Sequence, residues 1–173
     1  MIEKKGQVWI ETVLYILIGL ALIGLTLAIV TPKINQAKDR ILVEQSIAAL
    51  NVFDEKIRET LNRGQGNSRV VSEFLIKKGK MTINPQEETI TLELTGLGKP
   101  YSEAGVKIKI GEIEVLTTSG RGKSSNAALT LNYSNAANLT YLQNDVDVKD
   151  FAATSAPYSF VIRNLGRTDI SNF

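Results

Sequence analysis

An uncharged apolar run near the N-terminus constrains this chain more than any other feature. From Val13 to Val30 the residues are Leu, Ile, Val, Ala and Tyr, interrupted only by Gly19, Gly24 and Thr26. About 20 such residues, at a rise of 1.5 Å each, match a hydrocarbon core of about 30 Å. A soluble helix of this length with no polar face is unusual, so the run predicts a membrane-spanning segment.

The run fits either a cleaved secretory signal or a retained membrane helix. A secretory signal has an apolar core of 7–15 residues followed by a small-residue cleavage site. Here the core is longer, and the chain continues as an amphipathic helix with apolar residues at roughly helical spacing: Ile34, Ile41, Ala48, Val52 and Ile57. We therefore expect a retained helix. Lys4 and Lys5 precede it, which predicts a cytoplasmic N-terminus and a C-terminal bulk outside the membrane.

The pattern predicts one long helix from about Val8 to Asn62. Pro32 removes a backbone donor and marks either a bend in this helix or a boundary between two helices. We favour the bent single helix. Gly64, which opens the sequence GQGN after Arg63, is placed as its C-terminal cap.

Glu11 lies at the edge of the apolar run, and burying its charge at mid-membrane would cost about 2.5–3.5 kcal/mol. The free-energy cost alone leaves two interpretations of Glu11 open. The segment from Val13 to Pro32 is long enough to span a membrane without Glu11, which then sits among the lipid headgroups. Alternatively, the carboxylate has a function inside the apolar layer.

The residues KKGQVWIE resemble the class III signal peptide of archaeal type IV pilins and related surface-filament proteins. In that family a short basic leader ends in Gly and is followed by Gln, by Glu at the fifth mature position and by a long apolar helix. Trp9 and Tyr15 stand where the family usually has Ser and Leu. The resemblance implies cleavage by a prepilin peptidase between Gly6 and Gln7, which makes Glu11 the fifth mature residue.

Such a cut would create an α-amino group at Gln7, four residues before Glu11. In a bundle of staggered helices this ammonium can pair with the Glu11 of a neighbour, and a buried pair enforces register because breaking it is costly. Gly24 and Ala28 form a small-xxx-small spacing that lets helices approach closely. We expect assembly to depend on these residues.

After Asn67 the hydrophobic period changes to two. Apolar and polar residues alternate in five runs: TITLEL, VKIKI, EIEV, ALTLNY and YSFVIR. Strict alternation predicts half-buried antiparallel strands. Gly111-Glu112 suits a two-residue hairpin turn, and Asn84-Pro85 is a further turn signal. The predicted class is α+β: a long N-terminal helix followed by a small antiparallel β-sandwich or a sheet wrapped around the helix end.

Composition excludes most catalytic chemistry. The chain has no Cys and no His, so thiolate and imidazole groups are absent as nucleophiles, bases and metal ligands. The net charge is only +2, and the few aromatic residues are not interleaved with basic ones, so nucleic-acid binding is not expected. We expect neither an enzyme nor a bound cofactor.

Two stretches resemble ligand sites but depart from the templates. SGRGKSSN ends like a phosphate-binding loop, but the required upstream Gly is Thr117. The spacing of Asp145, Asp147 and Asp150 makes a weak calcium candidate, because an EF-hand loop would place Asp150 at its glycine position. We expect a polar loop and solvated acids, respectively.

Asn132-Tyr133-Ser134 and Asn138-Leu139-Thr140 are N-glycosylation sequons. Asn132 alternates with Leu131 and Tyr133, which predicts that it faces water. Asn132 and Asn138 are therefore candidate glycan acceptors.

These observations divide the chain into a leader (1–6), a long helix (7–63) and a β-rich extracellular head (64–173). Within the helix, 7–32 is the apolar assembly and membrane part and 33–63 is amphipathic. The leading hypothesis is a structural subunit of an archaeal type IV pilus-like surface filament, inserted in the cytoplasmic membrane before assembly. Its partners would be copies of itself, the prepilin peptidase and the pilus assembly machinery, with the head serving adhesion. The alternatives are a minor pseudopilin of a secretion or assembly machine, and a singly anchored surface protein that binds ligands without polymerising.

Overall fold

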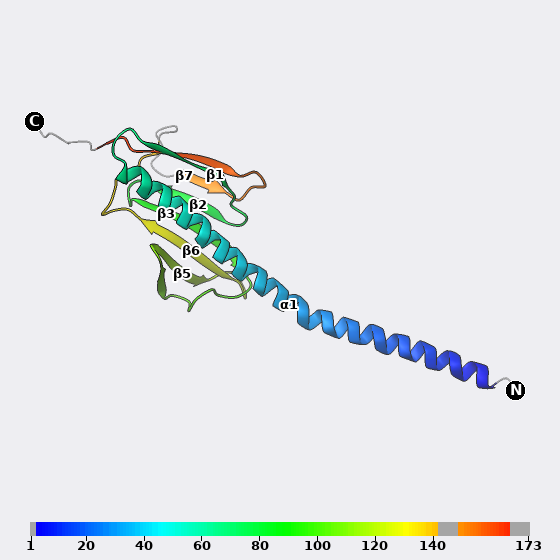
Figure 1. Ribbon diagram of the computed structural model, residues 1–173. Coiled ribbons are helices and arrows are strands. Elements are labelled where there is room, and N and C mark those ends of the chain that lie inside the picture. The colour runs from blue at the N-terminus through cyan, green and yellow to red at the C-terminus, as the bar shows by residue number, and fades with distance from the viewer. Residues whose placement is uncertain (1–2, 142–148, 167–173) are drawn as a thin grey trace, which may run out of the picture. The chain divides into compact units, whose positions relative to one another are not determined.

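The computed structural model describes residues 3–141 and 149–166, with side chains from residue 8 onward. It divides into two compact units, Met1–Lys38 and Asp39–Phe173, and each is described by itself. The elements, in chain order, are α1 (Glu3–Asn62), β1 (Ser68–Phe74), β2 (Lys80–Asn84), β3 (Thr89–Leu97), β4 (Lys107–Ile110), β5 (Ile113–Ser119), β6 (Ser125–Asn132), β7 (Lys149–Ala152) and β8 (Tyr158–Arg163) (Figure 1). The predicted α+β class, a long N-terminal helix followed by antiparallel sheets, is confirmed.

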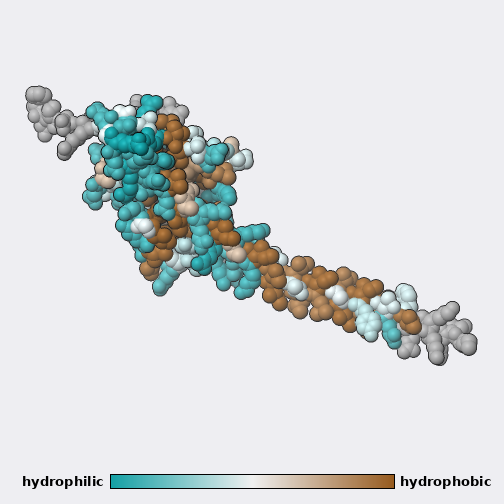
Figure 2. Space-filling model, in the orientation of Figure 1, coloured by the Kyte–Doolittle hydropathy of each residue, from teal (hydrophilic) through white to brown (hydrophobic). Residues whose placement is uncertain are grey.

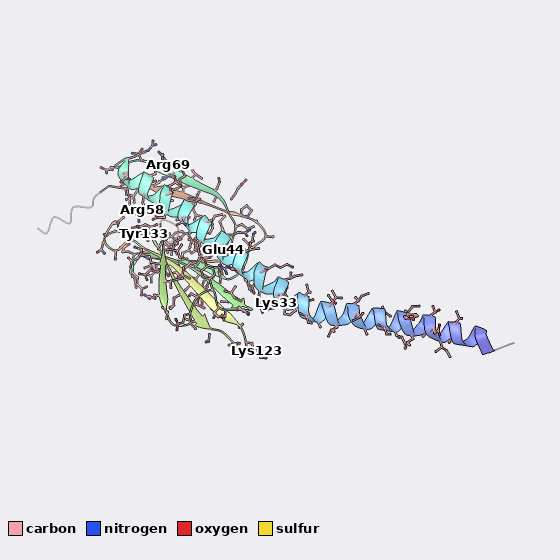
Figure 3. The ribbon with its side chains drawn as sticks, turned by 60° about the horizontal axis from the view of Figure 1, so that its bottom comes forward. Lys33, Glu44, Arg58, Arg69, Lys123 and Tyr133 are labelled. Carbon is pink, nitrogen blue, oxygen red and sulfur yellow. The ribbon has the colours of Figure 1, made fainter. Side chains whose placement is uncertain are left out.

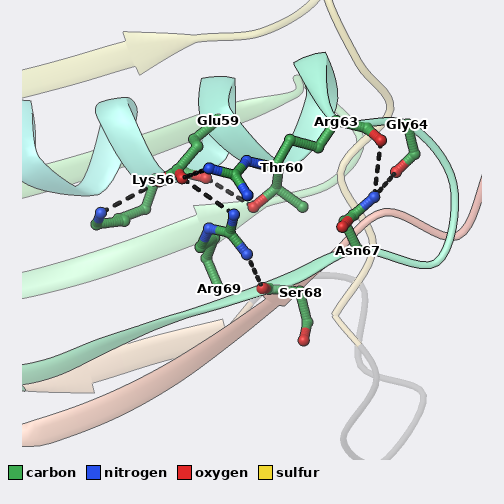
Figure 4. Close-up of polar contacts among 8 residues, drawn as sticks. All are labelled: Lys56, Glu59, Thr60, Arg63, Gly64, Asn67, Ser68 and Arg69. Carbon is green, nitrogen blue, oxygen red and sulfur yellow. Dashed lines mark hydrogen bonds and ion pairs between the residues drawn. The ribbon is translucent and has the colours of Figure 1, made fainter.

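Helix α1 is one element, with Pro32 inside it. It ends where the sequence predicts: Gly64 has a φ of +84°, and its amide donates to the Leu61 carbonyl at 3.2 Å. The Asn67 side chain then donates to the carbonyl oxygens of Arg63 (2.7 Å) and Gly64 (3.1 Å) (Figure 4). These bonds satisfy carbonyl groups that a helix end leaves without partners.

The strands form two antiparallel sheets. One has six strands in the order β4-β5-β6-β3-β2-β7, and the other pairs β1 with β8. On β3 the alternating residues Ile90, Leu92 and Leu94 are all buried, as their period predicts. Gly111 and Glu112 form the turn between β4 and β5, and Gly111 has the positive φ (+62°) that such a tight hairpin requires.

The core of the second unit lies between α1 and the sheets. The helix buries one stripe of side chains at helical spacing: Val43, Ile47, Leu50, Phe53 and Ile57. The inner faces of β3, β5 and β6 supply most of the opposing apolar side chains. The compact unit that begins at Asp39 therefore includes the last part of α1 as well as the strands β1 to β8.

A cluster of aromatic rings joins the two sheets to the helix. Phe53 on α1 makes edge-to-face contacts with Phe74 of β1 (5.7 Å between centroids) and Phe160 of β8 (5.4 Å). Phe151 of β7 packs on Phe160 at 5.0 Å, which connects the six-stranded sheet to the same cluster. Aromatic pairs in this geometry contribute about 0.5–1.5 kcal/mol beyond their buried area.

Glu59 links the last turns of α1 to β1. Its carboxylate contacts Lys56 (3.2 Å), Arg63 (3.0 Å) and Arg69 (3.0 Å) (Figure 4). Hydrogen bonds, first from Arg69 and then from Lys56, lower the pKa of Glu59 to about 2. The carboxylate therefore stays ionised far below neutral pH.

A buried hydrogen bond fixes α1 to the end of β6. The Tyr133 hydroxyl donates to Asp54 Oδ1 at 2.8 Å, while Arg58 Nε donates to Asp54 Oδ2 at 2.8 Å. Tyr133 is only 2% exposed and Asp54 8%. Burial, followed by the bond to Asp54, raises the pKa of Tyr133, so the phenol remains protonated as the donor.

Replacing Tyr133 by Phe should lower the free energy of unfolding by about 1–3 kcal/mol, because it deprives a buried carboxylate of a donor. Urea denaturation of the purified protein measures this change. The matched control is Tyr158→Phe, which removes an exposed bond to the Ala152 carbonyl (2.9 Å) and should cost less than about 1 kcal/mol. Equal losses in the two variants would contradict the role given to Asp54 and Tyr133.

Candidate assembly and membrane segment

From Val8 to Val30 the surface of α1 is apolar on every side, with Glu11 as its one charged residue. Large hydrophobic side chains are exposed around the whole helix: Val8, Trp9, Ile10, Leu14, Tyr15, Ile16, Leu17, Ile18, Leu20, Leu22, Ile23, Leu25, Leu27, Ile29 and Val30. Their exposed fractions run from 41% at Val30 to 72% at Tyr15. Figure 2 shows this part of the helix covered largely by hydrophobic residues. So much exposed apolar surface requires lipid or other protein to cover it.

By length and composition α1 is the one helix, among the described residues, that is able to cross a membrane. The apolar window shows no burial inside the molecule, which distinguishes it from the core helix of a soluble protein. A retained membrane helix and an N-terminal signal share these properties. The evidence for membrane association is therefore the exposed apolar surface of this segment.

The threonines in this segment keep their hydroxyl groups bonded within the helix. Thr12 donates to the Val8 carbonyl (2.9 Å), Thr26 to the Leu22 carbonyl (2.8 Å) and Thr31 to the Leu27 carbonyl (2.7 Å). A hydroxyl with an internal partner costs little to transfer out of water. The three polar residues are thus compatible with an apolar environment, which the sequence pattern alone does not show.

Glu11, Gly24 and Ala28 lie on α1 and are exposed. The next turn of the helix brings Ala28 over Gly24 on one face, and no atom lies within 4 Å of the position that a side chain on Gly24 would take. The backbone at Gly24 is therefore open to close approach. The backbone of Gly6 and Gln7 is helical, and the side chain of Gln7 lies outside the described residues.

The two sequon asparagines are on the surface of the head. Asn132, the last residue of β6, is exposed between buried Leu131 and Tyr133, in agreement with the alternation. Its Oδ1 accepts the Ser134 amide at 2.9 Å, so the side-chain nitrogen is left for other chemistry. Asn138 is also exposed.

The weak calcium candidate is not assembled in the described part of the chain. Asp145 and Asp147 lie outside the described residues. Asp150 accepts a hydrogen bond from Thr82 Oγ1 (2.6 Å) and pairs with Lys80 (3.4 Å), and these contacts lower its pKa. Within residues 3–141 and 149–166, no cluster of three carboxylates suitable for a metal ion occurs.

The loop SGRGKSSN forms the connection between β5 and β6, with Arg121 and Lys123 exposed. Its amide groups bond within the loop, Gly120 to the Ser124 carbonyl (2.9 Å) and Ser124 to the Arg121 carbonyl (3.4 Å). It is followed by a strand, not by the helix that a phosphate-binding loop requires.

Comparison with known proteins gives no match to a family model, to a curated protein or to a solved structure.

The double variant Leu20→Arg/Ile23→Arg should prevent stable membrane insertion. Each charge at mid-helix costs about 2.5–3.5 kcal/mol on insertion scales. Retention in carbonate-washed membranes measures the effect. Ile34→Arg/Ile41→Arg is the control, since both residues are exposed on α1 but lie beyond the apolar run. Equal retention of both variants would show that the run is not the membrane segment.

Proposed function

We propose that this chain is a structural subunit of a type IV pilus-like surface filament. In this proposal the apolar part of α1 holds the precursor in the membrane and later packs against the same segment of other copies. The observation that supports it best is the exposed, all-round apolar surface from Val8 to Val30. Lipid and neighbouring helices are both able to cover such a surface, one before assembly and the other after it.

The leader motif adds a mechanism to this proposal. Cleavage between Gly6 and Gln7 would leave the apolar surface intact and place an ammonium group four residues from Glu11. Between two staggered helices, that ammonium and the Glu11 carboxylate of a neighbour would form a pair away from water. Such a pair adds little to net stability, but an unpaired charge in the same place is costly, so it selects one register.

The head is proposed to form the filament surface. Its core is sealed by the helix, the sheets and the aromatic cluster, and the outer side of β6 carries the polar residues Asn126, Thr130 and Asn132. Asn132 and Asn138 are proposed as N-glycan acceptors on the surface of the head. An intact mass of the native head equal to the mass of the bare chain would contradict the glycan proposal.

Glu11→Ala should leave the protein in the membrane fraction and abolish filaments, because it removes the charge that selects register. Electron microscopy of negatively stained cells, with membrane fractionation of the same culture, measures both properties. Glu44→Ala is the control: this glutamate is also exposed on α1, and its partner, Arg40, lies on the same helix.

Normal filaments from the Glu11→Ala variant would contradict the pairing. Abundant long filaments from the unaltered chain would favour a major subunit over a minor pseudopilin. An uncut chain that never assembles would instead favour the anchored surface protein.

A further inference from the structure

One end of the head is built around Asp39, where α1 enters this unit. The Asp39 carboxylate accepts the Gly98 amide at 2.7 Å and pairs with Lys78 at 3.6 Å. The Lys78 ammonium also donates to the Gly96 carbonyl at 2.7 Å, and the Gly96 amide donates to Asn126 Oδ1 at 3.1 Å. These contacts place three loops beside the point where α1 enters the head. We call this region the entry end.

The three loops are the β1–β2 loop (75–79), the β3–β4 loop (98–106) and the β5–β6 loop (120–124). Figure 3 shows Lys123, on the third loop, at the opposite end of the head from Arg58, Arg69 and Tyr133. The head therefore has two distinct ends, with the sheet strands running between them.

The entry end carries exposed cations that have no carboxylate partner among the described residues. These are Lys77, Lys99, Arg121 and Lys123. Within the described residues, no carboxylate oxygen lies within 4.0 Å of any of the four. Lys77 donates to the neutral amide oxygen of Gln45 (3.0 Å).

Among the described residues, the acids of this end cancel only half of that charge. Asp39 is engaged by Lys78, while two further acids, Glu73 and Glu103, are exposed on the same set of loops and strand ends, so four unpaired cations face two carboxylates.

Within the described residues, most cations elsewhere in the head have a carboxylate partner. At the opposite end Lys56, Arg63 and Arg69 surround Glu59. Arg58 pairs with Asp54. On the β4–β5 hairpin, Lys107 pairs with Glu114 and Lys109 with Glu112. Among the described residues, Arg163 of β8 and Lys149 of β7 have no such pair, and Lys149 lies instead over the Tyr141 ring, 6.0 Å from its centroid. The concentration of unpaired charge at the entry end is thus a property of that surface and not of the head as a whole.

We propose that the entry end is a docking surface for anionic lipid headgroups, which holds the head against the membrane before assembly. Asp39 follows Pro32 by seven residues, so at most about 25 Å of chain joins this surface to the end of the apolar run. A basic residue near an anionic membrane contributes about a fivefold preference for the bound state. The inference depends on the membrane insertion contained in the proposed function. The competing occupant of the entry end is an acidic face on a second copy of the chain. A second copy is not held near this surface by the short connecting stretch of chain.

The experiment uses the full chain inserted into lipid nanodiscs at one copy per disc. Because the chain has no cysteine, Ser119→Cys provides a single labelling site, exposed at the end of β5. Energy transfer from this label to a headgroup-labelled lipid reports how close the entry end lies to the membrane. Discs of phosphatidylcholine are compared with discs that contain about 30 mol% phosphatidylglycerol.

Energy transfer should be higher in the anionic discs than in the phosphatidylcholine discs. In about 0.5 M NaCl, where the Debye screening length falls to a few ångströms, it should drop to the phosphatidylcholine value. Arg121→Gln/Lys123→Gln should lower the docked-to-undocked ratio by about 25-fold, as the product of two fivefold effects. The control Lys107→Gln/Lys109→Gln makes the same change in net charge on β4 and should retain the response. A circular dichroism spectrum confirms that each variant is folded.

Equal transfer in the two lipids, or equal losses in the two variants, would overturn docking at this surface. Transfer that appears only when two copies share a disc would assign the surface to a second copy. Resistance of the inserted chain to carbonate extraction is measured separately. Loss of the chain from the discs would overturn the proposed membrane insertion, and docking with it. Retention of the chain without an effect of lipid charge on energy transfer would overturn docking alone.

Discussion

The exposed apolar surface of the first part of α1 is the constraint on which the rest depends. Burial of apolar surface is worth about 25 cal/mol per Å², and this segment exposes hydrophobic side chains around its whole circumference. Its threonine hydroxyls bond to its own backbone, so few polar groups require water. A helix with this surface is stable in lipid or in a bundle of similar helices, and is not stable alone in water.

The later part of α1 is also helical, but its surface pattern differs from that of the first part. From Asp39 onward only one stripe, from Val43 to Ile57, is apolar and buried, and the sheets cover it. The Asp39 contacts fix the beginning of this stretch, while Asp54, Glu59 and the bonds around Gly64 fix its end. The head is therefore organised along its helix, with polar contacts at both ends of an apolar interface.

Much of this fold is predictable because its signals are local. The period of two in TITLEL and the small residues at Gly64 and Gly111 identify β3, the end of α1 and one hairpin. Strands β1, β2 and β7 were not predicted. In β1 the alternation is broken by a bulge at Ser72 and Glu73, and β7 is only four residues long. Their strand character depends on pairing with distant segments, which a local pattern does not contain.

The candidate site was predictable to a similar degree. The apolar run, Glu11 and the Gly24–Ala28 spacing are visible in the sequence, and so is the exposure of Asn132. The internal bonds of the threonines and the gathering of Lys77, Lys99, Arg121 and Lys123 on one end of the head were not visible. These features arise from backbone geometry and from loops that are far apart in the chain.

The proposed function depends most directly on removal of an N-terminal leader to give an assembly helix. Mass spectrometry of the N-terminal peptide of the protein isolated from cell membranes and surface filaments tests it directly. The proposed function predicts a mature chain that begins at Gln7, with two lysines and one glutamate removed, so that the net charge falls from +2 to +1. A mature chain that begins before Gln7, or one cut within or after the apolar run, would contradict it.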